Sequence, residues 1–297
     1  MADAPRHEPV MLAEVVAMLE PGRGGLFVDC TTGLGGHTGA LLEAGAHRVL
    51  ALDRDADALA VAGQRLEAFK DRVELVHSDY RQLSRVLEGR GVEQVDGILA
   101  DLGVSSMQLD LDGRGFSFRR DEPLDMRMDR SQGPTLAELL ATVDEEDLAN
   151  VIFQFGEERH SRRIARAIVR ERSHREIATT GVLAEIVRRA VPVRGYQRID
   201  PATRTFQALR IWVNRELEGL DVFLSDAARR LGAGARLAVI TFHSLEDRIV
   251  KHTFRGLSAA GDTWQVLTRK PMVPRDEELA RNPRARSAKL RAIERLA

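Results

Sequence analysis

The residues of this sequence best suited to chemistry lie in one stretch, from Asp29 to Asp53. A strand-like segment at 26–29 is followed by a glycine-rich loop at 31–37, a helix-like stretch and a second strand-like segment that ends at Asp53. Glycines directly after a strand let the backbone turn sharply and approach a ligand, and an acidic residue ending the next strand can accept hydrogen bonds from both ribose hydroxyls. The order predicts a pocket for a nucleoside-bearing cofactor at one edge of a parallel sheet.

Two positions distinguish this loop from a dinucleotide-binding loop. The G-x-G-x-x-G pattern counted from Gly33 requires a small residue at position 38, where this chain has Thr38. Asp29 would also repel a pyrophosphate. S-adenosylmethionine fits better, because it carries an adenosine, an ammonium and a sulfonium but no phosphate. The alternative is a loop that only connects a strand to a helix. The position of Asp53 at the end of the next strand-like segment argues against this alternative.

Polar residues follow the next two strand-like segments. Asp79 and Tyr80 come after the third segment, where a carboxylate can accept from an adenine amino group and an aromatic ring can stack on its face; turn chemistry is the alternative. The segment 101–106 follows the fourth and places Asp101, a glycine and two serines where a methyl donor and acceptor should meet. The alternative there is a turn capped by Asp101 and Ser105.

A later strand-like segment is followed by His243 and Ser244. We expect Ser244 to cap the following helix and His243 to reach into the pocket as a substrate contact or proton acceptor. A serine hydrolase is discounted, because the G-x-S-x-G pattern is missing around Ser244. Metal binding is poorly supported, since the eight histidines are scattered and form no H-x-x-x-H motif.

Two arginine-rich segments are candidates for contacts with nucleic acid. In the first, Arg194 and Arg198 flank Tyr196, whose ring could stack on a base. The second lies near the C-terminal end and comprises Arg281, Arg284, Arg286, Lys289 and Arg291. A solvated run of charges is the alternative, and we favour it for the second segment.

The composition sets the limits for these options. The 297 residues, 43% of them hydrophobic, suffice for one large domain or two smaller ones. A net charge of −1 means that any site for a polyanion must be a local patch. The single cysteine, Cys30, excludes an intramolecular disulfide and fits a reducing compartment, the cytosol by default. We expect neither a membrane span nor a signal peptide.

From residue 26 to residue 100 short apolar runs alternate with helical ones. Strands are expected near 26–30, 48–53, 73–77 and 95–100. This alternation is typical of a parallel sheet covered by helices on both faces. The sequence therefore predicts an α/β fold.

The alternation stops between residue 108 and about residue 205. This stretch contains no convincing strand but amphipathic helical segments, one with a capping box at Thr135 and Glu138 and one that Asp144 could cap. A polar helix face there carries Arg162, Arg163, Arg166 and Arg170. The pattern then resumes with a long helix at 203–230, a strand at 236–242, a helix from 245 and a β-prone run at 263–268. We expect one α/β domain interrupted by a helical insert of roughly a hundred residues.

Six motifs occur in a fixed order along the chain. They are His7-Glu8-Pro9-Val10-Met11-Leu12, the loop from Asp29 to Thr38, Asp53-Arg54-Asp55, Asp101 to Ser106 with Gln108, Arg204 to Arg210, and His243 to Arg248. In this order they closely resemble the bacterial 16S ribosomal RNA cytosine-N4 methyltransferase family. The resemblance spans the whole chain, including 282–284 and 289–291.

The resemblance implies a class I S-adenosylmethionine-dependent methyltransferase, with a Rossmann-like core at 1–107 and 206–297 and a helical substrate-recognition domain at 108–205. The implied substrate is a cytosine in the decoding centre (P-site region) of 16S ribosomal RNA within the small ribosomal subunit. Neither a metal nor a membrane partner is implied, and the oligomeric state stays open, a homodimer being one alternative. On matching positions the cofactor site would comprise Gly35, Gly36, His37, Asp53, Tyr80, Asp101 and Gln108. The family often has phenylalanine where Tyr80 stands, which keeps a stacking face.

Asp101 and His243 are the catalytic candidates. The N4 nitrogen of cytosine is a weak nucleophile, because its lone pair is delocalised into the ring. Acceptors for its two hydrogens would aim that lone pair at the sulfonium methyl group, and in-line placement does much of the remaining work. We expect Asp101 and nearby backbone carbonyls to be these acceptors, with His243 the weaker candidate for taking the proton. The target base must be unstacked to enter.

Two functions of other kinds remain alternatives. An NAD-dependent oxidoreductase would use the same loop, but Thr38 and Asp29 argue against it. A non-catalytic factor of RNA assembly would keep the pocket without the chemistry, and the combination of Asp53, Asp101 and Gln108 argues against that.

Overall fold

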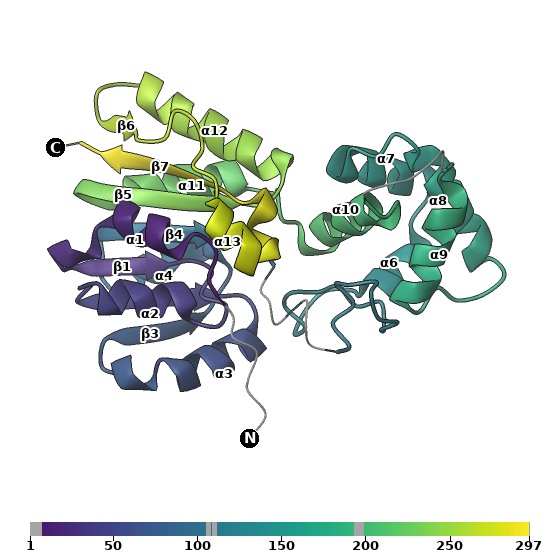
Figure 1. The fold of residues 1–297 in the computed structure, drawn as a ribbon, viewed down its shortest axis with the longest axis horizontal. Helices are drawn as coiled ribbons and strands as arrows, with labels where there is room; N and C mark the ends of the chain where they lie inside the picture. The colour runs from purple at the N-terminus through teal and green to yellow at the C-terminus, as the bar shows by residue number, and fades with distance from the viewer. Residues whose placement is uncertain (1–7, 105–107, 109–111, 193–198, 297) are drawn as a thin grey trace. The chain divides into compact units, whose positions relative to one another are not determined.

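The computed structural model describes residues 8–104, 108, 112–192 and 199–296. The chain forms two compact units, one made of Met1–Ser105 with Gly219–Ala297 and the other of Ser106–Glu218 (Figure 1). Within the described residues, no helix combines the length and the apolar character that a bilayer span requires.

A seven-stranded sheet forms the centre of the first unit. Its strands lie in the order β3-β2-β1-β4-β5-β7-β6. They are β1 (Leu26–Asp29), β2 (Arg48–Asp53), β3 (Val73–His77), β4 (Val95–Asp101), β5 (Leu231–Thr241), β6 (Trp264–Val266) and β7 (Lys289–Arg295). Neighbouring strands from β3 to β5 are parallel, whereas β7 is antiparallel to both β5 and β6. The expected α/β class and the first four strands are confirmed.

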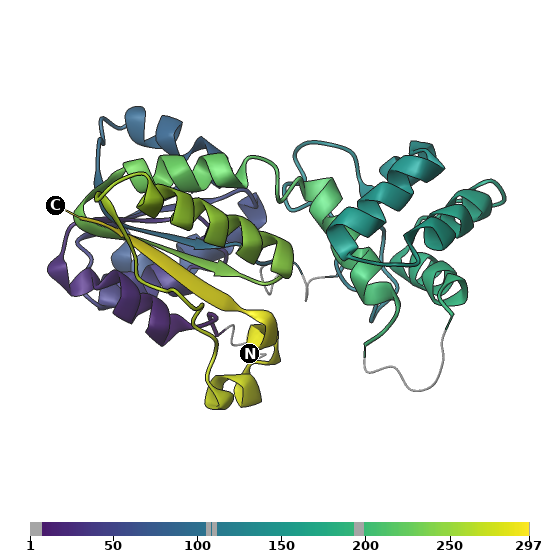
Figure 2. The same cartoon turned by 90° about the horizontal axis from the view of Figure 1, so that it is seen from above.

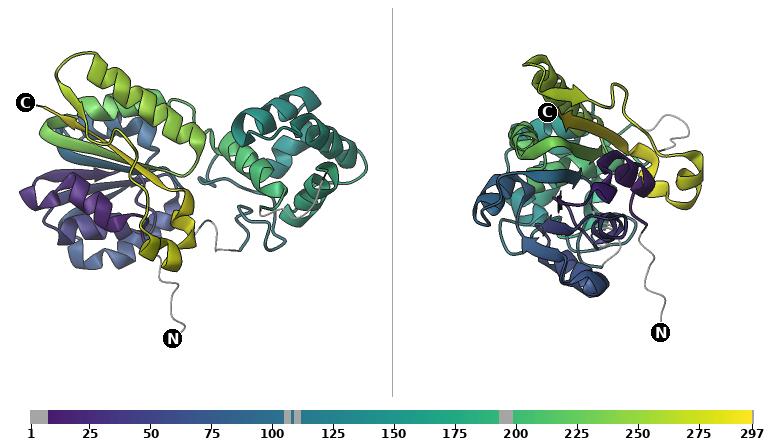
Figure 3. Two further views of the ribbon diagram at one scale, coloured as in Figure 1. Left: turned by 45° about the horizontal axis from the view of Figure 1, so that its top comes forward. Right: turned by 90° about the vertical axis from the view of Figure 1, so that its left-hand side faces the viewer.

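Helices cover both faces of this sheet (Figure 2, Figure 3). They are α1 (Leu12–Leu19), α2 (Gly36–Glu43), α3 (Ala56–Arg65), α4 (Leu83–Glu88), α11 (Leu220–Arg229), α12 (Ser244–Ala259) and α13 (Asp276–Arg281). Successive side chains of a strand point to opposite faces. Phe27 accordingly packs in a buried cluster with α1 and α2, and Val28 packs in a second cluster with α4, α11 and α12.

The second unit is helical. Its helices are α6 (Leu136–Thr142), α7 (Glu145–Gly156), α8 (Ser161–Arg172), α9 (Thr180–Ala190) and α10 (Ala202–Asn214). The capping box of Thr135 and Glu138 is confirmed at the start of α6. Asp144 stands at the N-cap of α7, but its side chain makes no capping hydrogen bond. Helix α7 packs against both α8 and α10.

The single long helix expected at 203–230 is wrong. Helix α10 ends at Asn214 and α11 begins at Leu220, with left-handed backbone at Arg215 (φ 51°) and Gly219 (φ 67°) between them. The apolar spacing continues through the break, because both helices bury an apolar face, but they bury it in different units. Since α10 packs on α7, the second unit extends to Glu218, whereas the insert expected from the sequence ends at 205.

Candidate active site

Three aspartates end three neighbouring strands of the sheet. Asp29 ends β1, Asp53 ends β2 and Asp101 ends β4, and these strands lie in the order β2-β1-β4. The chain runs from β1 to β2 and β3 on one side and continues with β4 and β5 on the other. Ligands of open α/β sheets bind at the carboxyl ends of the strands, where the strand order reverses in this way. The three carboxyl groups therefore stand at the expected ligand edge.

The glycine loop after β1 is tied to the end of β2. The Gly33 N–H donates to Oδ2 of Asp53 (2.7 Å), and Oδ1 of Asp53 accepts from the Asp55 N–H (2.8 Å). Gly35 has φ 82°, and a Cβ on Gly36 would lie 2.3 Å from Cγ of Pro9. Both positions therefore need glycine, and Asp53 holds the loop in place.

Asp29 has a structural role inside this loop. Its side chain is fully buried, and it accepts hydrogen bonds from the Thr38 hydroxyl (2.7 Å) and the Thr31 N–H (3.1 Å). Each of its oxygens therefore has a partner within the chain, and the expectation that Asp29 suits a cationic group of the ligand stays a prediction. Thr38 is the residue that departs from the dinucleotide pattern, and its hydroxyl group holds the Asp29 side chain in place.

His37 and Asp101 form the opposite wall. The Val10 carbonyl can only accept, so Nε2 of His37 donates to it (3.0 Å). Burial lowers the pKa of His37, although the Asp101 carboxylate opposes that shift, so the ring is neutral at pH 7 and Nδ1 is an acceptor. Nδ1 lies 3.9 Å from Oδ2 of Asp101, and Oδ1 of Asp101 is buried with no hydrogen-bond partner in the described part of the chain. Two hydrogen-bond acceptors, Nδ1 of His37 and the Asp101 carboxylate, therefore lie close together here without a donor between them in the described part of the chain.

The three aspartates make this edge strongly negative. Burial raises the pKa of Asp29, Asp53 and Asp101 to about 6 each, and the charge of Asp29 adds to the shift of the other two. All three are still mostly ionised at pH 7. A ligand group with positive charge would relieve this repulsion.

Asp79 and Tyr80 follow β3, as expected. Asp79 accepts from the Arg81 N–H (2.9 Å) and from the Arg81 guanidinium, so the structure shows turn chemistry at this position. Tyr80 is 8% exposed and its ring packs against Phe223, with ring centroids 4.6 Å apart. Stacking of Tyr80 on a ligand stays a prediction.

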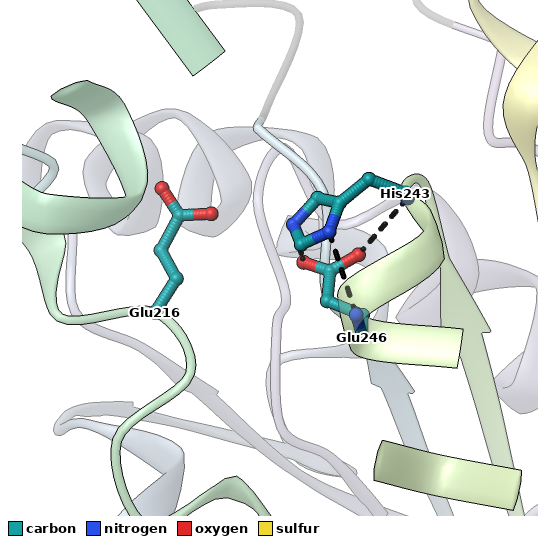
Figure 4. Close-up of side chains that lie close together, drawn as sticks. All are labelled: Glu216, His243 and Glu246. Carbon is teal, nitrogen blue, oxygen red and sulfur yellow. Dashed lines mark hydrogen bonds and ion pairs between the residues drawn. The ribbon is translucent and has the colours of Figure 1, made fainter. Parts of the chain in front are cut away.

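His243 is the N-cap of α12, and the expectation that Ser244 would cap it is wrong. Nδ1 of His243 accepts from the Glu246 N–H (3.4 Å), and Glu246 in return accepts from the His243 N–H (3.4 Å). Nε2 lies 3.1 Å from Oε1 of Glu246, so both ring nitrogens face this glutamate (Figure 4). Ser244 is exposed. Histidine is not a preferred N-cap residue, which is why the capping box was missed.

Two of the five residues of the C-terminal basic segment are part of the sheet. Arg291 and Lys289 lie in β7, where both pair with Asp247 (2.6 and 3.1 Å). The interpretation as a solvated charge run is therefore wrong for these two residues. The segment at 194–198 lies outside the described residues. Gln108 is buried and belongs to the second unit.

Sequence reasoning also missed residues that build the site through contacts within the chain. The Thr31 hydroxyl accepts from the Asp101 N–H (2.6 Å), and the Thr32 hydroxyl donates to the Leu52 carbonyl (3.0 Å). The N-terminal segment contributes the Val10 carbonyl and the Pro9 ring. The two threonines were visible in the loop, but contacts to other strands leave no local signal.

The sheet order with an antiparallel β7, together with three aspartates at the strand ends of the switch point, is that of a class I S-adenosylmethionine-dependent methyltransferase. The chain belongs to the MraW methylase family, whose model matches residues 4–296.

Curated relatives resemble almost the whole chain. A ribosomal RNA small subunit methyltransferase H of Sorangium cellulosum is 51% identical over 98% of this chain and 91% of its own length. Proteins of the same name from Bradyrhizobium diazoefficiens and Anaeromyxobacter dehalogenans are each 49% identical, over 99% and 98% of this chain and 93% and 98% of their own lengths. A solved rRNA methylase from Streptococcus thermophilus has 14% identity and a TM-score of 0.42, covering 100% of this chain and 99% of its own.

Proposed function

We propose that this protein methylates N4 of a cytosine in the decoding centre (P-site region) of 16S ribosomal RNA, within the small ribosomal subunit and in the cytoplasm. The name that the relatives share, ribosomal RNA small subunit methyltransferase H, supports ribosomal RNA of the small subunit as the substrate. The observation that carries the chemistry is the Asp101 carboxyl group, which stands at the end of β4 with Oδ1 buried and unpaired among the described residues.

The residues at the strand ends fit S-adenosylmethionine, which supplies an electrophilic methyl group on a sulfonium when bound. Asp53 would accept from the ribose hydroxyls, and Gly35 and Gly36, whose missing Cβ atoms leave room for Leu66 and Pro9, would shape the loop that lines the ligand. The negative charge of the edge matches the ammonium and the sulfonium. We assign His37 and Tyr80 to the same site, and a role of Gln108 in cofactor binding stays a prediction.

Asp101 would prepare the nucleophile. The exocyclic amine of cytosine has two hydrogens, and the unpaired Oδ1 can accept one of them. This hydrogen bond would draw the nitrogen lone pair out of the ring and direct it at the methyl group. A charged acceptor contributes about 1.5–3 kcal/mol per hydrogen bond, and more where water is excluded.

His243 would be the second candidate, as the acceptor of the proton that N4 releases. Its ring lies against the buried Glu246, with Nε2 3.1 Å from Oε1. A proton taken up by the imidazole would therefore be paired with a carboxylate at once. Transfer through His243 requires its Nδ1 to give up the weak 3.4 Å hydrogen bond with the Glu246 N–H.

The helical unit would recognise the RNA. Helix α8 buries Ile164 and Ile168 on one side and exposes arginines on the other. The exposed arginines are Arg162, Arg163, Arg166 and Arg170. A guanidinium binds phosphate oxygens in a fork, so such a helix face suits a nucleic-acid backbone.

Mass spectrometry of nucleosides tests the proposal. Small-subunit particles are incubated with the protein and a methyl-labelled donor, and the label should appear in N4-methylated cytidine. Asp101→Asn should lower the rate at least about a hundredfold while RNA binding changes less than about twofold. Asp71→Asn, the same change at an exposed residue, should alter neither. Label in another nucleoside, or loss of RNA binding with normal turnover of bound substrate, would contradict the proposal.

A further inference from the structure

A pocket of about 290 Å³ lies in the first unit, away from the strand-end aspartates. Helix α12 and the strands β6 and β7 with their flanking residues form its walls. It is lined by Lys251, Phe254, Arg255, Val266, Thr268, Arg269 and Arg291. Four of these seven side chains are cationic and none is acidic. The whole chain has a net charge of −1, so this cluster is a local feature.

Three of the four cations have no partner among the described residues. Lys251 and Arg255 stand one helical turn apart on α12, and Arg269 follows β6. Across the described residues, none of the three makes a hydrogen bond or an ion pair. The fourth, Arg291, is buried and donates from Nε to Asp247 (2.6 Å), a carboxylate that also pairs with Lys289. Like charges gathered in this way favour binding of an anion.

The rest of the pocket strengthens this preference. Phe254 and Val266 give it an apolar side, which lowers the local dielectric and strengthens charge interactions. Thr268 is buried, and its Oγ1 accepts from the Ala292 N–H (2.9 Å). The Thr268 hydroxyl therefore still has its own hydrogen to donate. Forked arginine donors, a lysine and a hydroxyl form a donor set that matches phosphate oxygens.

The sheet fixes where the pocket lies relative to the strand ends. β6 and β5 are both antiparallel to β7 and hence parallel to each other. Thr268 and Arg269 follow β6, which runs in the same direction as β5. The Thr268 hydroxyl accepts from the Ala292 N–H, and Ala292 pairs with Ala238 of β5, three residues before that strand ends at Thr241. An anion held there would therefore lie on the flank of the sheet, short of the strand ends.

We propose that this pocket binds a phosphate group. The source of the phosphate rests on the proposed function: we assign it to the backbone of the RNA substrate, outside the target cytosine. A free phosphate or nucleotide presents the same chemistry, and the experiment separates the two sources.

Lysine footprinting on the full-length wild-type protein is the first test. The chain has only four lysines, and Lys70 is exposed and remote from the pocket in sequence, so it serves as an internal control. Acetylation of Lys251 is followed by mass spectrometry with a 16S ribosomal RNA fragment, with inorganic phosphate, or with neither. RNA should slow modification of Lys251 severalfold more than that of Lys70.

The salt dependence of RNA binding is the second test. Arg255→Ala/Arg269→Ala removes two exposed cations of the pocket, and Arg65→Ala/Arg85→Ala removes two exposed arginines elsewhere in the same unit. The slope of log K against log salt should fall by about 0.7–0.9 for one lost phosphate contact in the first variant. It should not change in the second variant, which has the same net charge.

The outcomes separate the possibilities. Protection of Lys251 by RNA with the lower slope supports a backbone phosphate. Protection by inorganic phosphate with an unchanged slope supports the phosphate site but assigns it to a free ligand. No protection of Lys251 by either probe overturns the proposal, and so does protection by RNA alone with equal slopes in the two double variants. Protection of Lys251 in a protein that forms no N4-methylcytidine would refute the proposed function and leave the pocket intact.

Discussion

Asp53→Asn is the most direct test of the cofactor site. The substitution keeps the size of the side chain but leaves one acceptor oxygen instead of two. In the structure, Oδ2 accepts from the Gly33 N–H and Oδ1 from the Asp55 N–H, at 2.7 and 2.8 Å. In the variant, one of these donors faces an NH₂ group, so the loop is held less firmly. The same loss applies to the ribose hydroxyls of a bound cofactor.

The expected loss of affinity follows from one hydrogen bond to a charged group, about 1.5–3 kcal/mol. This corresponds to a Kd for S-adenosylmethionine that rises about 10-fold to 100-fold. The free energy of unfolding should change less. Burial raises the pKa of Asp53 to about 6, so the wild-type protein carries a cost for the buried charge at pH 7, and asparagine removes that cost.

Calorimetric titration of S-adenosylmethionine into the full-length protein measures the affinity, and a thermal melt of the same sample measures the stability. Asp71→Asn is the matched control, because it makes the same chemical change at an exposed position. If Asp53→Asn binds the cofactor as tightly as the wild type, or if both variants weaken equally, the assignment of Asp53 to the ribose is refuted.

Three further substitutions test the structure around the site and in the helical unit. Burial raises the pKa of Asp29 from 3.8 to about 6. As the pH rises from about 4 to about 7, the free energy of unfolding of the wild type should therefore fall by up to about 3 kcal/mol relative to that of Asp29→Asn. Parallel curves of unfolding free energy against pH for the two proteins would contradict this. Gly36→Ala should place a methyl group 2.3 Å from Cγ of Pro9 and lower stability by about 1–3 kcal/mol, and an unchanged melting temperature would show that the contact yields. Asn214→Ala should leave the buried Met128 N–H without its 2.8 Å acceptor and the Met126 carbonyl without its 2.8 Å donor, at a cost of about 1–3 kcal/mol in denaturant unfolding; an unchanged free energy of unfolding would contradict this.

The sequence by itself determined the strand-end chemistry. Alternating apolar runs predicted β1 to β4, and the position of Asp53 after the second run predicted its place beside the glycine loop. These signals are local, because strand periodicity and the need for glycine at a tight turn act over a few residues. Thr38 also pointed away from a dinucleotide, although its bond to Asp29 could not be foreseen.

Only the tertiary structure decided how distant segments meet. β7 lies between β5 and β6, so Arg291 is buried against Asp247, although its segment reads as a polar run. The basic pocket likewise gathers residues from 251 to 291 that no short pattern connects. The break between α10 and α11 depends on packing in two units, since the apolar spacing is the same on both sides. Pairing and packing between remote segments are set by the free energy of the whole fold, which leaves no mark on any single stretch of sequence.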